Sequence, residues 1–167
     1  MILLSTISLL LVVSAVLLWR TLRCRDTSVP VSADAPVKAE LMPGAEHLSQ
    51  ALQIPTISGE EEPFDAFAAW IEKTYPLTHR RLTCTKAAAW TRIYCWEGTE
   101  PSLEPVLLTA HQDVVPPGNA DHWDYPPFSG HRSDGYIWGR GAIDMKVQLV
   151  SIMETIELLL KKGFTPK

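Results

Sequence analysis

The sequence has no excess of basic residues and none of the common enzyme motifs. Its 167 residues include 15 Lys and Arg against 19 Asp and Glu, a formal charge of −4, and no basic cluster interleaved with aromatic side chains. Nucleic-acid binding is therefore not predicted. The sequence also lacks a G-x-S-x-G elbow, an H-E-x-x-H motif and a phosphate-binding loop. These absences exclude three familiar classes of hydrolase and nucleotide-binding enzyme.

Cysteine and asparagine are scarce. The three cysteines, Cys24, Cys84 and Cys95, show no C-x-x-C spacing, which argues against a structural zinc knuckle. Cys84 and Cys95 flank an expected hairpin turn, and two alternatives stay open for them: a disulfide across the hairpin or two half-buried thiols. The only asparagine, Asn119, is not followed by a glycosylation signal, so glycosylation gives no support for secretion.

An apolar run without charged residues occupies residues 2–19 and is followed by Arg20, Arg23 and Arg25. A helix of this length, at about 1.5 Å per residue, nearly spans a hydrocarbon core of about 30 Å. A signal peptide would carry a basic N-terminal region and a nearby cleavage site, and both are lacking. We favour a transmembrane anchor over a signal segment and expect a membrane-anchored or secreted protein of the secretory pathway.

The orientation of this segment stays open. The arginines follow the apolar run, so the positive-inside rule places the downstream domain in the cytosol. A secreted or luminal enzyme requires the opposite orientation.

Composition divides the chain into three regions. Residues 1–19 form the anchor or signal segment, residues 20–43 form a linker rich in Pro, Ser and Ala, and residues 44–167 form a folded domain. A near-continuous apolar run at residues 105–110 predicts a central strand buried on both faces. Hydrophobic periodicity predicts helices over residues 46–52, 60–75 and 144–162, and strands over residues 77–85, 90–97 and 136–139. The last helix is expected to bury Leu149, Ile152, Met153, Ile156 and Leu160. This order predicts an α/β domain with helices packed on a sheet.

Candidate site residues follow the central strand. His111 and Asp113 lie where the chain leaves the sheet, and period-two alternation places their side chains on the same side. Asp113 is suited to accept the second N–H of the imidazole and so to fix the ring. An H-x-D pair alone is a weak signal, because most such pairs are surface residues.

Asp144 strengthens the signal. It follows Gly139-Arg140-Gly141 at the expected start of the last helix, where an N-cap is the alternative role. A carboxylate there can bridge two cations, and His with Asp ligation suits zinc. We therefore predict His111 and Asp144 as metal ligands and Asp113 as the residue that orients His111.

Two basic residues near Asp144 have expected roles of their own. Arg140 is predicted to pair with an acidic neighbour and hold the glycine turn. Lys146 is predicted to neutralise local carboxylates.

Three ordered motifs resemble those of the co-catalytic zinc metallopeptidases. They are H-Q-D-V-V-P at residues 111–116, W-x-x-P-P-F-S-G at 123–130, and D-G-Y-I-W-G-R-G-A-I-D-M-K at 134–146, with L-Q-I-P-T-I-S at 52–58 upstream. This family includes aminoacylase-1, acetylornithine deacetylase and carboxypeptidase S. The chain most resembles the branch of carboxypeptidase S and the N-fatty-acyl-amino acid synthase/hydrolase, which an N-terminal hydrophobic segment also fits.

The resemblance implies a fold, a cofactor and a reaction. It implies a central mixed sheet flanked by helices and a complete site with two Zn2+ ions, in which His111 binds one ion and Asp144 bridges both. It makes Asp113 the catalytic residue that orients His111, and it places a cis peptide after Asp144. The implied substrate is a peptide or an N-acyl amino acid, and the implied partner is a second copy, bound through a dimerisation domain.

The chain departs from the family pattern at its end. The family's general-base glutamate, its adjoining glutamate ligand and its final histidine would follow the last helix. We therefore expect an N-terminal fragment that does not hydrolyse amides by itself. A catalytically inactive membrane-anchored fragment or a metal-binding module is the alternative.

Overall fold

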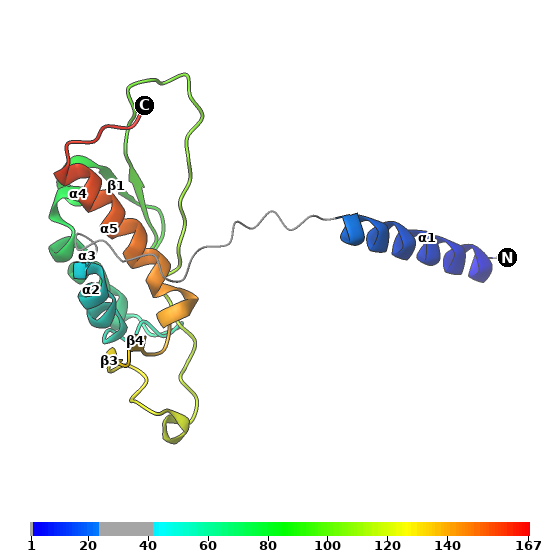
Figure 1. Cartoon of the computed structure of the whole chain (residues 1–167), viewed down its shortest axis with the longest axis horizontal. Helices are drawn as coiled ribbons and strands as arrows, with labels where there is room; N and C mark the ends of the chain where they lie inside the picture. The colour runs from blue at the N-terminus through cyan, green and yellow to red at the C-terminus, as the bar shows by residue number, and fades with distance from the viewer. Residues whose placement is uncertain (1, 24–41) are drawn as a thin grey trace. The chain divides into compact units, whose positions relative to one another are not determined.

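The structure is a computed structural model that describes residues 2–23 and 42–167. The chain separates into two compact units, an N-terminal one that contains a single described helix and a folded domain (Figure 1). The predicted linker, residues 20–43, lies mostly outside the described residues. The predicted division into three regions stays a prediction.

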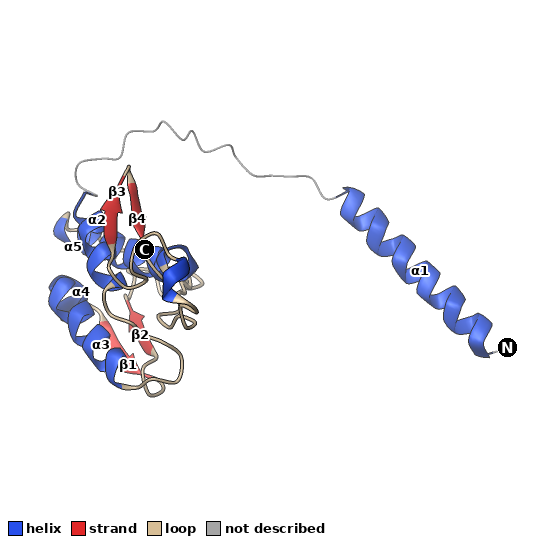
Figure 2. Cartoon of the chain, turned by 90° about the horizontal axis from the view of Figure 1, so that it is seen from below, coloured by secondary structure: helices blue, strands red, loops and turns tan. Residues whose placement is uncertain are grey.

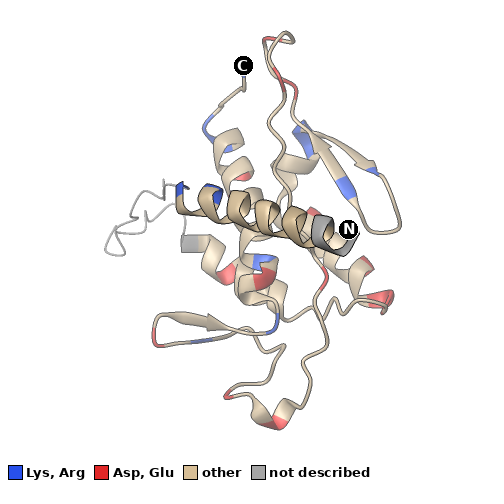
Figure 3. Cartoon of the chain, turned by 90° about the vertical axis from the view of Figure 1, so that its right-hand side faces the viewer, with Lys and Arg blue, Asp and Glu red and all other residues tan. Residues whose placement is uncertain are grey.

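The N-terminal helix, α1, spans Ile2–Arg23 and is longer than the predicted apolar segment. Its part from Thr6 to Arg23 has a mean hydropathy of 1.6, enough in length and composition to cross a membrane. Charge is confined to its last turn, at Arg20 and Arg23 (Figure 3). The guanidinium carbon of Arg23 lies 4.6 Å from the ring centroid of Trp19. This helix therefore fits a membrane anchor or a signal segment.

The described part of the folded domain combines helices with short strands. Its elements in order are α2 (Met42–Leu52), α3 (Glu62–Thr74), α4 (Pro76–Arg81), β1 (Thr83–Lys86), β2 (Arg92–Cys95), η2 (Ala120–His122), β3 (His131–Ser133), β4 (Tyr136–Trp138), η3 (Ala142–Lys146) and α5 (Val147–Lys161). The predicted helices over residues 46–52, 60–75 and 144–162 correspond to α2, α3 and α5.

The core lies between α2, α3 and α5. Its buried side chains are Leu48, Ala51, Leu52, Phe67, Ile71, Tyr75, Val150 and Met153. Within α2 and α3 these residues recur at helical spacing, so each helix buries one face. The buried face of α5 differs from the predicted one: Val150, Met153 and Glu157 are buried, and of the predicted stripe only Met153 is.

Helix α4 replaces part of a predicted strand. Pro76 occupies the first turn, where its fixed φ and missing N–H are tolerated. The buried Glu157 carboxylate of α5 accepts hydrogen bonds from Leu77 N (3.0 Å) and from Thr78 N and Oγ1 (2.9 Å each). The strand predicted over residues 77–85 is therefore wrong before Thr83, because a distant carboxylate satisfies the first N–H groups of a helix.

The described strands form two separate antiparallel hairpins, β1–β2 and β3–β4 (Figure 2). The strand predicted over residues 136–139 is confirmed as β4, and its partner β3 was not predicted. The expected central mixed sheet is not confirmed in the described residues. Residues 105–110 are extended without strand pairing, and Val106 and Leu107 are 87% and 82% exposed. The predicted burial of this segment is wrong, because no described strand lies hydrogen-bonded beside it.

The register of the first hairpin determines whether Cys84 and Cys95 can form a disulfide. Cys84 lies opposite Tyr94, and Cys95 lies opposite Thr83. Because successive side chains alternate between faces, Cys84 and Cys95 point to opposite faces of the ribbon. Both thiols are free and exposed. The disulfide considered for them does not form, and neither thiol is half-buried as the alternative required.

Candidate metal centre

A short pairing with an upstream loop holds the end of the extended segment. Ile57 and Val114 form an isolated parallel bridge. The Val114 amide donates to the carbonyl of Thr56 (2.8 Å), and the Ser58 amide donates to the carbonyl of Val114 (3.0 Å). Val114 is consequently buried, and the backbone that carries Asp113 is fixed on one side.

A tight turn brings Asp144 toward this segment. Gly141 has φ of 82°, and a Cβ on it would lie 2.4 Å from Cγ1 of Val114. Only glycine combines the left-handed conformation with so close an approach. In η3, which follows, Asp144 and Met145 depart from helical dihedral angles, with φ of −115° and −146°. The peptide bond between them is cis, as the resemblance implied.

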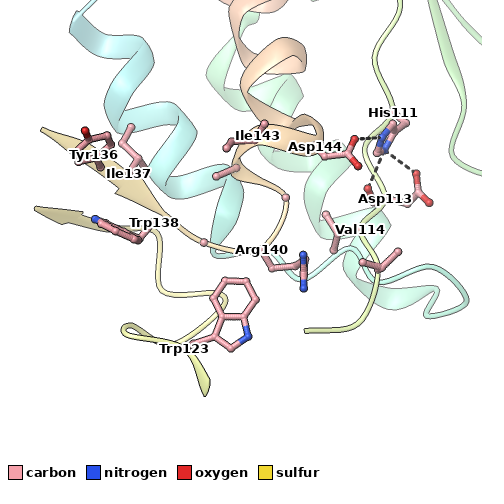
Figure 4. Close-up of a pocket in the computed structure, with 14 residues that line it drawn as sticks. His111, Asp113, Val114, Trp123, Tyr136, Ile137, Trp138, Arg140, Ile143 and Asp144 are labelled. Atoms are coloured by element: carbon pink, nitrogen blue, oxygen red, sulfur yellow. Dashed lines mark hydrogen bonds and ion pairs between the residues drawn. The ribbon is translucent and has the colours of Figure 1, made fainter. Parts of the chain in front are cut away.

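The structure brings together all three predicted site residues (Figure 4). His111 Nε2 lies 3.0 Å from Asp144 Oδ1. His111 Nδ1 lies 2.9 Å from the backbone oxygen of Asp113 and 3.2 Å from its Oδ1. Nδ1–H therefore donates to Asp113, and Nε2 is turned toward the Asp144 carboxylate. Asp144 caps no helix, and its side chain is 88% exposed.

A serine that the sequence did not single out supports Asp113. Ser58 Oγ donates to Asp113 Oδ2 at 2.7 Å. This hydrogen bond, with the nearby His111, holds the pKa of Asp113 below its usual value against the opposing effect of burial. Asp113 therefore stays ionised and able to accept from the imidazole.

The imidazole of His111 is a stronger base than usual. Desolvation lowers its pKa, but hydrogen bonds to Asp144 and Asp113 and the charges of both carboxylates outweigh that effect and raise it. Hydrogen bonds to a charged form favour that form. The site therefore attracts positive charge at Nε2, supplied either by a proton or by a metal ion.

Comparison with known proteins finds a family match over part of the chain. Residues 107–167 match peptidase family M20/M25/M40. The matched stretch contains all three predicted site residues, together with η3 and α5.

Similar proteins are found among peptidases and amide hydrolases. The chain is 41% identical to a probable carboxypeptidase S-like 2 of Dictyostelium discoideum, over 74% of this chain and 25% of that protein. It is 38% identical to the N-fatty-acyl-amino acid synthase/hydrolase PM20D1 of Mus musculus, over 73% of this chain and 25% of that protein. The chain thus spans about a quarter of the length of these curated relatives.

A solved structure shares the fold. The crystal structure of an M20 family metallo-carboxypeptidase, Sso-CP2 from Sulfolobus solfataricus, matches with a TM-score of 0.55 and 26% sequence identity. The match covers 76% of this chain and 28% of that one. The family resemblance is therefore to metal-dependent hydrolytic enzymes.

The donor set of the segment that matches this family fits a divalent metal. His111 presents an unprotonated nitrogen when Nδ1–H donates to Asp113, and Asp144 presents a carboxylate oxygen beside it. Two ligands about 2.0–2.1 Å from one tetrahedral zinc ion lie about 3.3 Å apart, close to the 3.0 Å between these atoms. No group of three or more metal-ligating side chains occurs in residues 2–23 and 42–167, so His111 and Asp144 form a two-ligand site within the described residues.

A cavity of about 430 Å³ opens beside the two ligands. His111, Asp113 and Asp144 lie at one end of it (Figure 4). Its other walls are mostly apolar and include Val115, Trp123, Ile137, Trp138 and Ile143. A ligand in this cavity would contact metal-binding groups at one end and apolar side chains along the rest of its length.

Arg140 has a different partner from the predicted one. Its guanidinium carbon lies 4.9 Å from the ring centroid of Trp123, and its amide donates to the carbonyl of Pro127 at 2.7 Å. No ion pair of Arg140 with an acidic side chain is found in the described part of the chain. The predicted acidic partner is therefore wrong: a cation–π contact and a backbone hydrogen bond hold Arg140 instead.

Lys146 does not neutralise the site carboxylates, contrary to prediction. It is fully buried, and Nζ donates to the carbonyls of Ala51 (2.8 Å) and Ile54 (2.6 Å). The ammonium nitrogen also lies 4.7 Å from the ring centroid of Phe67. Burial lowers the pKa of Lys146 to about 7. The residue ties the end of α2 to the turn that carries Asp144.

Proposed function

We propose that this protein is a zinc-dependent hydrolase that cleaves a peptide or N-acyl-amino acid amide bond. The convergence of His111 Nε2 and Asp144 Oδ1 at 3.0 Å carries the proposal, because Asp113 holds the opposite ring nitrogen. The match of residues 107–167 to peptidase family M20/M25/M40 supports it. The names of the relatives, a carboxypeptidase and an N-fatty-acyl-amino acid synthase/hydrolase, support both substrate classes.

Each site residue has a separate task in this proposal. His111 and Asp144 would hold the metal, and the second oxygen of the exposed Asp144 carboxylate would be free to hold a second ion. Asp113 holds the imidazole in the tautomer that leaves Nε2 free, and its low pKa keeps it ionised in this role. When bound, zinc would polarise the scissile carbonyl and increase the acidity of the attacking water.

The cavity beside the ligands supports an apolar substrate group. Trp123, Trp138 and Ile143 provide hydrophobic walls within reach of the polar end. An acyl chain or an apolar side chain would bury its surface there while the amide lies at the metal ligands.

A second candidate is a metal-binding module without chemistry. The observation that favours it is that the described residues supply only two converging ligands. In either case α1 supports anchoring in a membrane or entry into the secretory pathway. Resistance of the protein to extraction from membranes by alkaline carbonate tests the anchor.

A chimera distinguishes the two candidate functions. Residues 42–167 replace the matched segment of the mouse N-fatty-acyl-amino acid synthase/hydrolase, and zinc-dependent release of the amino acid from an N-acyl substrate is measured. We expect hydrolysis by the chimera and at least a hundredfold loss in H111A and D144A, with activity retained in H122A, because His122 lies in the exposed η2. Zinc retention without hydrolysis would favour the binding module.

A further inference from the structure

The two metal ligands come from segments that are separated in the chain. His111 follows the extended segment, whereas Asp144 lies in η3, 33 positions later. The two segments touch directly where Gly141 packs against Val114, and a third element that holds both would fix their relative position further. Residues 51–58, which contain the last residues of α2 and the loop that follows, form such an element; we call them the 51–58 clamp.

One end of the clamp holds the His111 side of the site. The buried Thr56 accepts from the amide of Val114 through its carbonyl and donates from Oγ1 to the carbonyl of Gln112, at 2.8 and 2.5 Å. Ser58 donates from its amide to the Val114 carbonyl and from Oγ to Asp113 Oδ2, at 3.0 and 2.7 Å. The clamp therefore fixes the backbone on both sides of Asp113 and one oxygen of its carboxylate.

The other end of the clamp holds the Asp144 side. Lys146 Nζ donates to the carbonyls of Ala51 and Ile54, and its own amide donates to the carbonyl of Gly141 at 2.9 Å. Carbonyls at the C-terminal end of a helix lack partners within the helix and favour a cation. A buried ammonium that lost these acceptors would pay a desolvation penalty. These hydrogen bonds therefore hold Lys146 in one place. Because Asp144 lies only two residues before Lys146, they also restrain the backbone of Asp144.

We propose that Lys146 and Ser58 are positioning residues that act through the 51–58 clamp to set the distance and orientation between His111 Nε2 and Asp144 Oδ1. Neither residue needs to touch metal or substrate. Lys146 fixes the turn that carries Asp144, and Ser58 fixes the carboxylate that orients His111. This inference rests on the metal site of the proposed function.

The test compares four variants of the full chain in non-ionic detergent, with H111A as a separate check on the metal site. K146M removes the ammonium at similar volume, and K73M is its control on the exposed face of α3. S58A removes the hydroxyl, and S58T restores one at the same position. Zinc affinity is measured by competition with a chelating dye, and the ring nitrogen shifts of His111 are measured by NMR in the metal-free chain.

The expected result is a loss of zinc affinity of about tenfold or more in K146M and S58A, the range found for residues that orient metal ligands. K73M and S58T should stay within about twofold of the original chain. In the metal-free chain, K146M and S58A should also shift the His111 ring nitrogens, because Asp144 or Asp113 no longer holds its place beside them.

Several outcomes separate this inference from a purely structural role and from the proposed function. A lower melting temperature with unchanged His111 shifts in K146M and S58A would overturn it. If K146M does not fold, S58A decides, because Ser58 is exposed and its hydroxyl is not part of the core. Equal zinc binding by H111A and the original chain would contradict the proposed metal site, whereas the metal-free shifts would still confirm or overturn the positioning role.

Discussion

Two neighbouring parts of one extended segment have opposite environments. Val106 is 87% exposed, and Val114, eight residues further on, is 3% exposed. Both are β-branched, and both lie in extended backbone. The difference is the partner: Val114 forms a bridge with Ile57 and packs against Gly141, whereas residues 105–110 pair with no described strand. Burial is favourable for any hydrophobic side chain, but of these two valines only Val114, which has a hydrogen-bonded neighbour, is buried.

The largest expected effect tests this comparison directly. V114D places a carboxylate in a buried position without a partner, and we expect a loss of about 3 kcal/mol or more in the free energy of unfolding. V106D, the matched control, should change it by no more than about 0.5 kcal/mol, because the side chain stays in water. Urea unfolding followed by tryptophan fluorescence measures both. Similar losses in the two variants would show that residues 105–110 are buried in solution.

The next effect concerns the histidine that lies between the two parts. D113N keeps the shape of the side chain but weakens its hold on His111, so zinc affinity should fall about tenfold to a hundredfold. D121N, in the exposed η2, serves as the control and should bind zinc like the original chain. Equilibrium dialysis against zinc buffers measures the affinity. If D113N retained full affinity, the orienting role of Asp113 would be wrong.

A smaller effect isolates the close approach at Gly141. Both Gly141 and Gly118 have positive φ, 82° and 71°, but only a Cβ at Gly141 would meet Val114. G118A should cost about 1 kcal/mol from the backbone alone. G141A should cost about 1–3 kcal/mol more, because the added methyl overpacks the site. Thermal unfolding of the two variants gives the difference, and equal costs would show that the turn adapts without strain.

The smallest effect is a pH dependence. The folded-state pKa of His111 is raised above about 6.5, and a proton on Nε2 competes with the metal. Zinc affinity should therefore be constant above the folded pKa and fall by up to about tenfold per pH unit below it. In the metal-free chain the same shift adds stability that is complete below about pH 6.5 and is lost as pH rises through the folded pKa. Solvent screening keeps this contribution small, because the side chain is 46% exposed.

Titration of zinc affinity between pH 5 and 9 measures this dependence. In the metal-free chain, the variant D144N removes one of the carboxylates that raise the pKa of His111, so this pKa, followed by NMR, should fall. An unchanged pKa of His111 in D144N would contradict the contact between these two residues.

Local patterns predicted the helices better than the strands. The apolar spacing of α2 and α3 and their neighbouring prolines identify these helices without knowledge of the fold. Residues 77–81 looked like a strand and form α4, because Glu157 accepts from its first N–H groups across 79 and 80 positions. The buried face of α5 was also misplaced, because an apolar pattern does not include Glu157, which is buried there with Val150 and Met153.

The sequence alone predicted the chemistry that the site can offer. His111, Asp113 and Asp144 are predicted from residue type, from spacing along one strand and one turn, and from ordered motifs that resemble those of the co-catalytic zinc metallopeptidases. These are local properties, so they can be recognised from the sequence without knowledge of the fold. The glycine turn before Asp144 and the length of the apolar N-terminal segment are of the same kind.

Tertiary structure alone decided how these residues are held. Ser58 reaches Asp113 across 55 positions, and Lys146 reaches Ala51 across 95. Hydrogen bonds between residues so far apart in the chain depend on how whole helices and loops pack, so no local sequence pattern predicts them. For that reason Lys146 was assigned to the carboxylates near it in sequence, whereas the fold gives it the carbonyls at the end of α2.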